Sequence, residues 1–157
     1  MSIRPAPNTP PSDSIVPADQ APLLDFLGYH VRRAYLTVQA DFDACIQKLD
    51  LRQTEFGVMS ILCANPGINQ KTLAEALAIA PPNLAMLLDR LENRKLLKRR
   101  RSMEDKRVQL VSLTQQGTRL YDKALEAARE ADQRSASKLT RAEIDQLKVL
   151  LGKMFAR

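Results

Sequence analysis

Residues 96–114 read LLKRRRSMEDKRVQLVSLT, and this stretch predicts two short strands around a charged tip. The second strand roughly alternates apolar and polar residues, with Val108 and Leu110 on one side and Gln109 between them. A period of two places one face of a strand on a core and the other in water. The tip, residues 101–106, is polar apart from a methionine, so we expect it to stay solvated as a projecting finger.

The excess positive charge of the chain lies in one short segment. Residues 94–107 contain eight lysines and arginines and two acids, a net charge of +6, which equals the net charge of the whole chain. The remaining residues are therefore neutral overall. Such a concentration of cations is typical of a site for a polyanion. The alternative is a basic loop that only aids solubility.

The composition favours one domain of ordinary size with a helical core. The chain has 157 residues and 45% hydrophobic content, but only 4% aromatic residues and no tryptophan. The core must then be built from leucine, alanine, isoleucine and valine, which suits helices. No apolar run approaches the roughly 18 residues of a membrane span, and no apolar signal segment begins the chain, so we expect a cytoplasmic protein with no membrane partner.

The residues needed for catalysis are scarce. His30 is the single histidine, and the five glycines form no phosphate-binding loop. We therefore expect no enzymatic activity, no metal and no cofactor. Cys45 and Cys63 lie among apolar neighbours without metal-ligand spacing, so we expect buried, inert thiols.

Helical patterns precede the basic stretch. Residues 1–20 hold five of the nine prolines and predict a disordered or loosely attached arm. An apolar stripe at steps of three and four follows from Leu23 to Leu49 and predicts one long amphipathic helix. Asp50 and Gln53 are candidates to cap the next helix, which should end at the Asn-Pro-Gly turn at positions 65 to 67.

Two short helices lead into the basic stretch. Asn69 is a good N-cap for the first, and Pro81-Pro82 suits the first turn of the second. A short helix, a tight connection and a helix of about three turns form the helix-turn-helix pattern. A basic hairpin directly after it makes the combination a winged helix.

Two more helices complete the chain, with Thr114 and the Thr140/Glu143 box as their caps. Their apolar stripes and that of the first helix exceed what a small winged-helix core can cover, which indicates a homodimer interface. The predicted fold is mainly α with a small β-hairpin wing: a winged helix-turn-helix core plus N- and C-terminal dimerisation helices. The expected parts are the arm at 1–20, the first dimerisation helix at 21–48, the DNA-binding lobe at 49–114 and the C-terminal dimerisation helices at 115–157.

A series of spaced motifs runs through residues 49–121. The motif residues are Phe56, Val58, Asn65, Pro66, Gly67, Leu73, Ala74, Leu77, Leu88, Arg90, Leu91, Glu92, Asp105, Arg107, Leu113, Thr114 and Gly117. This pattern closely resembles the multiple antibiotic resistance regulator (MarR) family of winged helix-turn-helix regulators. The resemblance implies a dimeric regulator with dimerisation helices at both chain ends. It also implies an effector pocket between those helices and the DNA-binding lobe.

The chain departs from the family pattern at several positions. The family often has threonine where Arg52 stands, so the start of the second helix should be capped differently here. The family often has serine or threonine near Pro82 and Ala85 and a polar residue where Met86 stands, so the recognition face is unusually apolar. Glycine is common where Lys95 stands, and it would permit a positive φ; Lys95 must either accept strain or change the turn.

We expect the wing and the helix-turn-helix to contact double-stranded DNA. Arg101 suits a narrow minor groove, and by resemblance Asp105 pairs with an arginine, Arg107, to organise the wing tip; the alternative is that the two arginines exchange these roles. Arg90 has an alternative reading, an ion pair with Asp89 or Glu92. The predicted DNA-binding residues are Gln70, Lys71, Thr72, Pro82, Asn83, Met86, Arg90, Arg100, Arg101, Ser102, Lys106 and Arg107.

One side of the first helix combines aromatic rings, an imidazole and a guanidinium, a set that suits a small anionic effector such as an aromatic carboxylate or its thioester conjugate. The alternative is that these residues pack the dimer interface and that Arg33 pairs with an acid such as the partner's Asp41. The candidate effector residues are Phe26, Tyr29, His30 and Arg33, with Phe56 and Met59 on the opposite wall.

The sequence thus predicts a dimeric repressor that an effector releases from a pseudo-palindromic operator. Two alternatives stay open. One is a regulator that senses oxidants through a cysteine, and the other is a non-specific architectural DNA-binding protein without an effector.

Overall fold

The structure is a computed structural model that describes residues 20–155. The arm predicted for residues 1–20 lies almost wholly outside the described residues. The elements in chain order are η1 (Ala21–Leu23), α1 (Leu27–Ile46), η2 (Gln47–Leu49), α2 (Gln53–Ala64), β1 (Ile68–Asn69), α3 (Gln70–Leu77), α4 (Pro81–Asn93), β2 (Leu97–Arg101), β3 (Gln109–Leu113), α5 (Gln115–Ser135) and α6 (Arg141–Phe155). The prediction of a mainly helical chain with a winged helix-turn-helix is confirmed.

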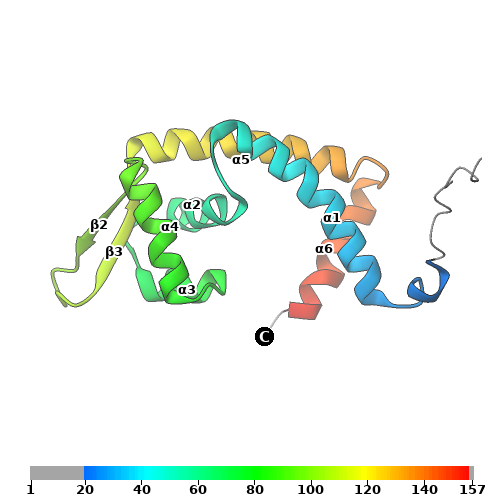
Figure 1. Cartoon of the computed structure of the whole chain (residues 1–157), viewed down its shortest axis with the longest axis horizontal. Coiled ribbons are helices and arrows are strands. Elements are labelled where there is room, and N and C mark those ends of the chain that lie inside the picture. Colours follow the sequence, from blue (N-terminus) through cyan, green and yellow to red (C-terminus); the bar gives the residue numbers. More distant parts are fainter. Residues whose placement is uncertain (1–19, 156–157) are drawn as a thin grey trace, which may run out of the picture.

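The molecule has two parts joined by the long helix α5 (Figure 1). Helices α2, α3 and α4 and the small sheet form a lobe at one end. Helix α1, helix α6 and the second half of α5 lie at the other end. Helix α1 packs along α5, and Lys148 of α6 lies 4.0 Å from the carboxylate of Asp132 of α5.

The single long helix predicted from Leu23 to Leu49 is wrong at both ends. A 3₁₀ turn and a break precede α1, and a second 3₁₀ turn follows it. The predicted cap of α2 is also wrong. Asp50 takes a left-handed conformation with φ of 51°, and the N-cap is Arg52, whose backbone N–H donates to Glu55 at 2.8 Å. The chain reverses direction at Asp50, so its side chain turns to other partners.

The helix-turn-helix follows its sequence signals. Helix α2 ends before the Asn-Pro-Gly turn, and the Asn69 side chain accepts the Thr72 N–H at 2.8 Å at the start of α3. Ala78 ends α3 in a left-handed conformation, and Pro81 begins α4. The predicted end of α2 and the predicted starts of α3 and α4 are confirmed, because each rests on local turn or capping chemistry.

The sheet has three antiparallel strands in the order β1-β3-β2. Arg99 pairs with Val111 across the hairpin, and Ile68 of β1 pairs with Val111 on its other side. The two-residue strand β1 was not predicted. The prediction that the Val108 and Leu110 side of β3 faces the core is also wrong, since Val111 is fully buried while Leu110 is half-buried. The added strand centres the sheet on Val111.

The start of α5 is hydrogen-bonded to the turn that follows α4, the recognition helix of the helix-turn-helix. The Thr114 hydroxyl accepts the Gly117 N–H at 3.0 Å and donates to the Lys95 carbonyl at 2.7 Å, while the Thr114 N–H donates to the Leu96 carbonyl. A Cβ at Gly117 would lie 1.9 Å from the Leu96 carbonyl oxygen, so glycine is required for this approach.

The capping box of α6 is also confirmed. The Thr140 N–H donates to Glu143 at 2.7 Å, and the Glu143 N–H donates to the Thr140 hydroxyl at 3.3 Å. The backbone hydrogen bond from Thr140 holds the pKa of Glu143 below its usual value.

The core lies in the lobe and along the contact of α1 with α5. Helix α6 contains no buried residue, and the first half of α1 is largely exposed. Large apolar side chains on and beside these two helices are therefore exposed to solvent in the single chain. They are Leu23, Leu24, Phe26, Leu27, Val31, Tyr35, Leu36, Val38, Leu139, Leu147, Val149, Leu150, Met154 and Phe155.

We expect Gly117→Ala to lower the free energy of unfolding by about 3 kcal/mol, because the added methyl collides with backbone that β2 and β3 hold in place. Urea denaturation followed by circular dichroism measures the change. Gly57→Ala is the control, since its Cβ would meet Leu77 at an ordinary 3.5 Å. Equal stabilities for the two variants would contradict the close approach of α5 to the Leu96 carbonyl.

Candidate nucleic-acid interface

The beginnings of α3 and α4 meet the start of β3, next to the wing tip, in one hollow of about 480 Å³. Gln70 and Lys71 of α3, Pro81 of α4 and Arg107 of the wing lie around it. The structure thus brings together predicted DNA-binding residues, such as Gln70 and Arg107, that lie up to 37 positions apart in the sequence. The first turn of α3 offers partly free backbone N–H groups beside Lys71, an arrangement that suits phosphate.

The wing tip is shaped by its own short-range hydrogen bonds. Asp105 accepts the backbone N–H of Arg107 at 2.9 Å and its Nε–H at 3.2 Å. These bonds, the side-chain one foremost, hold the pKa of Asp105 below its usual value. The Ser102 hydroxyl accepts the backbone N–H groups of Glu104 and Asp105. Ser102 therefore shapes the turn, whereas the Arg107 side chain remains 92% exposed.

Arg99, within the first wing strand, is committed to an intramolecular role. Its Nε–H donates to Glu92 at 2.8 Å, and its guanidinium also pairs with Asp89. The hydrogen bond to Glu92 is the largest cause of a raised Arg99 pKa. Arg99 ties β2 to α4 and sets the angle between the wing and the recognition helix.

The recognition helix presents an apolar and amide surface. Asn83 is exposed and Met86 is 71% exposed, and both line a hollow of about 630 Å³. Arg52 lines the same hollow from the start of α2. Sequence reasoning treated Arg52 as a capping change and missed it as an interface residue. The available signal was a long cation in place of the family's usual threonine.

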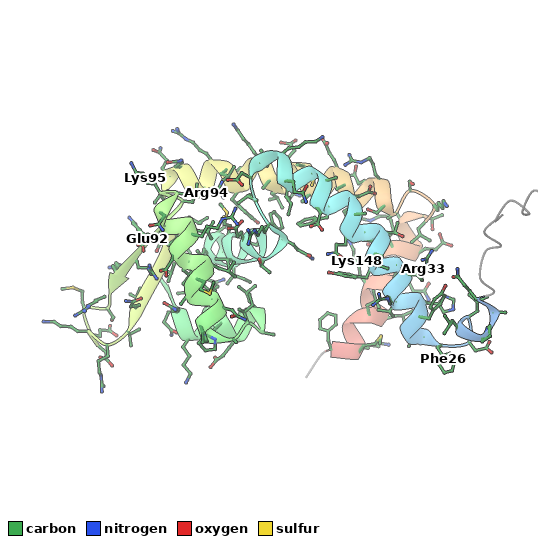
Figure 2. The ribbon with its side chains drawn as sticks, in the orientation of Figure 1. Phe26, Arg33, Glu92, Arg94, Lys95 and Lys148 are labelled. Carbon is green, nitrogen blue, oxygen red and sulfur yellow. The ribbon has the colours of Figure 1, made fainter. Side chains whose placement is uncertain are left out.

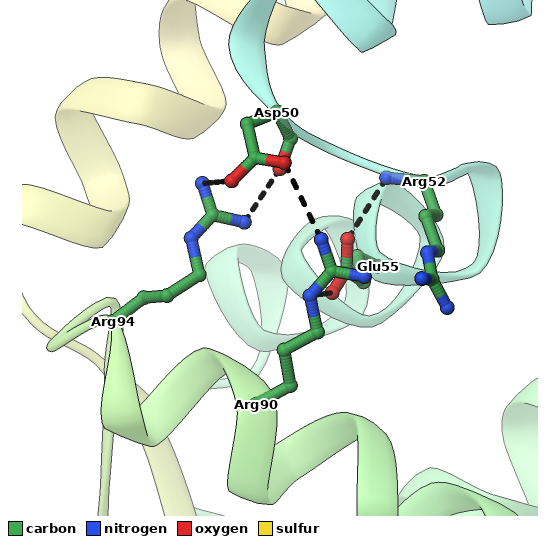
Figure 3. A network of polar contacts seen from close by, with 5 residues as sticks. All are labelled: Asp50, Arg52, Glu55, Arg90 and Arg94. Carbon is green, nitrogen blue, oxygen red and sulfur yellow. Dashed lines mark hydrogen bonds and ion pairs between the residues drawn. The ribbon is translucent and has the colours of Figure 1, made fainter.

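Arg90 has different partners from those predicted. It pairs with Asp50, at 3.4 Å, and with Glu55, whose Oε1 lies 3.1 Å from the Arg90 Nε without the alignment of a hydrogen bond (Figure 3). Asp89 and Glu92, the partners expected from helical spacing, bind Arg99 instead. Arg90 therefore points from the recognition helix into the lobe.

The same network holds the end of the recognition helix. Arg94 donates to the Asp50 carbonyl at 2.6 Å and lies 3.3 Å from the Asp50 carboxylate. Glu55 is fully buried, and its other oxygen accepts the Arg52 backbone N–H. Through Asp50, the turn between α1 and α2 contacts both Arg90 and Arg94 and so fixes the last turns of α4 (Figure 3).

Lys95 follows α4 with φ of 59°. The turn that glycine makes in the family is therefore kept, and a lysine in this left-handed conformation costs about 1 kcal/mol. Lys95 and Arg94 lie at the α5 end of the recognition helix, away from the wing tip (Figures 1 and 2). The basic segment predicted to act as one finger is divided between two places.

The predicted effector residues are not assembled within one chain. Phe26, the N-cap of α1, and Arg33 of α1 lie at the end far from the lobe (Figure 2). Tyr29 hydrogen-bonds Gln20, and the His30 Nε2–H donates to the Leu24 carbonyl at 2.6 Å. Five of the best-formed hollows among residues 20–155 do not include these four side chains in their linings.

The opposite wall of the predicted pocket belongs to the core. Met59 is fully buried, and the ring of Phe56 packs between Phe42 of α1 and Tyr121 of α5, at centroid distances of 5.2 and 5.8 Å. This aromatic stack joins the lobe to the two long helices.

The two cysteines differ. Cys45 is 7% exposed and donates to the Phe42 carbonyl at 3.0 Å; burial raises the pKa of its thiol, opposed chiefly by Arg134. Cys63 is exposed, so the expectation that both thiols are buried is wrong for Cys63. Within residues 20–155 we find no cluster of metal-ligating side chains and no helix long and apolar enough to cross a membrane.

A helix-turn-helix followed by a basic, projecting hairpin defines the class of winged-helix proteins. The sequence model of the MarR family matches residues 51–108. The transcriptional regulator HosA of Escherichia coli is 32% identical over 105 residues, which cover 67% of this chain and 78% of HosA. The chain belongs to the MarR family of transcriptional regulators.

Solved structures agree with this assignment. The transcriptional repressor CouR bound to a 23-mer DNA duplex superposes with a TM-score of 0.84 and 35% identity, covering 89% of this chain and 99% of that one. CouR from Rhodococcus jostii RHA1 bound to p-coumaroyl-CoA gives a TM-score of 0.76 and 25% identity, covering 85% and 95%. Both similarities extend beyond the lobe to the long helices.

Glu55→Gln should lower the free energy of unfolding by about 2 kcal/mol, because glutamine can still accept the Arg52 N–H but leaves Arg90 without its buried counter-charge. Chemical denaturation measures the change. Glu75→Gln is the matched control, since Glu75 is exposed and its side chain makes no ion pair in the described part of the chain. A loss no larger than that of the control would show that the buried pair adds nothing.

Proposed function

We propose that this chain is a homodimeric repressor that binds a pseudo-palindromic operator and is released by a small, aromatic anionic effector. The observation that carries the DNA-binding part is the hollow shared by α3, α4 and the wing, which has Lys71 and Arg107 on its rim. The presence of a similar repressor, CouR, on a DNA duplex supports the same use of this face. Such a regulator works in the cytoplasm, where its DNA lies.

Free cations at the wing support contact with phosphates or with a narrow minor groove. Arg100, Arg101 and Lys106 are exposed, and no carboxylate within the described residues lies within 4 Å of them. We assign Arg101 to the minor groove, with Asp105 and Arg107 holding the tip in shape. Asn83 and Met86 are the residues of α4 best placed to read base edges, through an amide and a thymine methyl contact.

The open apolar faces of α1 and α6 support a homodimer. Many large apolar side chains on these two helices are exposed in the single chain, and such a concentration is typical of an interaction site. A two-fold axis through these helices would present two wings and two recognition helices to one DNA duplex.

The effector assignment requires that dimer. Phe26, Tyr29, His30 and Arg33 are all exposed or nearly so in the single chain, and a partner is needed to enclose them. The structure of Rhodococcus jostii CouR with p-coumaroyl-CoA supports an aromatic thioester as one ligand class. Burial disfavours the thiolate of Cys45, so the oxidant-sensing alternative would have to use Cys63, which is exposed.

Replacing Arg101 tests the DNA-binding part. Arg101→Ala should weaken binding to all sequences and reduce the slope of log K against log[salt] by about 1.8, because the homodimer loses one cation from each of its two wings. Fluorescence anisotropy over a range of salt concentrations measures the slope. Lys138→Ala, which removes a remote exposed cation, should leave it unchanged. An unaltered slope in Arg101→Ala would remove the wing tip from the contacts.

A footprint separates the regulator from an architectural protein. Protection confined to one palindrome on genomic fragments supports sequence-specific regulation, whereas uniform coating supports the architectural alternative. The same samples, cross-linked at low protein concentration, report whether the bound species is a dimer.

The effector part is tested with phenolic acids and their coenzyme A thioesters. A ligand should raise the melting temperature of the wild type, and Arg33→Ala should lose that shift because the guanidinium holds the anionic group. Arg32→Ala, the neighbouring exposed arginine on a different side of α1, should retain it. The pocket assignment fails if no compound shifts the wild type, or if both variants respond as the wild type does.

A further inference from the structure

A second basic hollow lies where the recognition helix ends and α5 begins. It has a volume of about 540 Å³ and is lined by Arg94, Leu96, Gln115, Gln116, Arg119, Leu120 and Lys123. Three of these residues are cations, and no carboxylate is among them. Neither the DNA-binding face nor the predicted effector pocket includes any of them.

Two of the cations have no internal counter-charge. Arg119 and Lys123 are exposed, and no carboxylate in residues 20–155 lies within 4 Å of either. Arg94 is tethered by Asp50, which fixes its guanidinium at one side of the hollow (Figure 3). The hollow therefore combines one pre-positioned arginine with two adaptable cations.

The placement of Arg119 and Lys123 is unfavourable for the helix itself. They stand four residues apart on α5, so two like charges are neighbours on one helical face. Arg119 also lies in the second turn, near the positive end of the helix dipole, and the first turn contains no acid. A bound anion would reverse the sign of both effects.

The hollow is remote from the predicted DNA face. The DNA face is built on the start of α4, whereas Arg94 follows the end of this 13-residue helix, about 20 Å away along its axis. In Figure 2 Arg94 and Lys95 lie beside α5, and Figure 1 places the start of α4 beside α3 at the opposite side of the lobe. A duplex lying on α3, the start of α4 and the wing tip does not extend to this hollow.

We propose that this hollow binds a phosphate-bearing small molecule, as a site separate from those for DNA and effector. Two guanidinium groups and an ammonium match the charge and the oxygen geometry of a phosphate or pyrophosphate group. The side-chain amides of Gln115 and Gln116 add polar donors, and Leu96 and Leu120 give an apolar base for the rest of the ligand. The volume is in the range of small-molecule sites.

Inorganic pyrophosphate is the probe for the experiment. Isothermal titration calorimetry on the full chain, at constant ionic strength, should give saturable binding to the wild type. The variant Arg119→Gln/Lys123→Gln should bind at least about tenfold more weakly, because two charge-assisted contacts are removed. The control Arg129→Gln/Lys138→Gln loses the same charge from exposed positions outside the hollow and should bind as the wild type does.

DNA affinity is the second measurement. Without pyrophosphate, Arg119→Gln/Lys123→Gln should bind DNA within about twofold of the wild type and with an unchanged salt slope, unlike a wing variant. A reduced salt slope would instead make these residues DNA contacts and overturn the proposal. The proposal would also be overturned if the wild type showed no saturable binding, or if the control variant bound pyrophosphate as weakly as Arg119→Gln/Lys123→Gln. Binding of sulfate and of chloride as tight as that of pyrophosphate would mark an adventitious ion only and would overturn it too.

Discussion

The arrangement of the lobe depends on one buried carboxylate. Glu55 is the only charged side chain found fully buried in the part of the chain that the structure describes, and burying a lone carboxylate is strongly unfavourable. Its two oxygens therefore require the Arg52 backbone N–H and the Arg90 guanidinium at the same time. This requirement fixes the start of α2 and the rotation of α4 about its own axis. The face of α4 that carries Asn83 and Met86 is turned outward as a result.

The elements that the sequence predicted correctly are those decided by local chemistry. Asn69, Thr114 and the Thr140/Glu143 pair cap helices through side chains that reach backbone groups three residues away, so spacing alone reveals them. The errors arise where distant segments meet. Asp50 left its expected capping role because Arg90 and Arg94, 40 or more residues later, bind it. Helical spacing could not show that Arg99 would occupy the acids expected to bind Arg90.

The basic segment shows the same limit for the candidate site. Its net charge of +6 correctly marked a surface rich in cations, because a sum over residues does not depend on the fold. The direction of each side chain does depend on it. The turn at Lys95 reverses the chain, so Arg94 and Lys95 remain beside α5, as Figure 2 shows, while Arg100 and Arg101 lie in β2 and Lys106 lies in the hairpin turn. The effector residues on α1 were likewise grouped by helical periodicity, which cannot show that Phe56 and Met59 pack elsewhere in the core.

The close approach of Gly117 to the Leu96 carbonyl makes α5 a lever. The helix has 21 residues and a length of about 31 Å, and its first turn cannot slide or rock against the base of the wing. A tilt of only about 5° at the far end of α5 would then displace the whole lobe by about 3 Å. A small repacking among the long helices would in this way move the wing through several ångströms without any distortion inside the lobe.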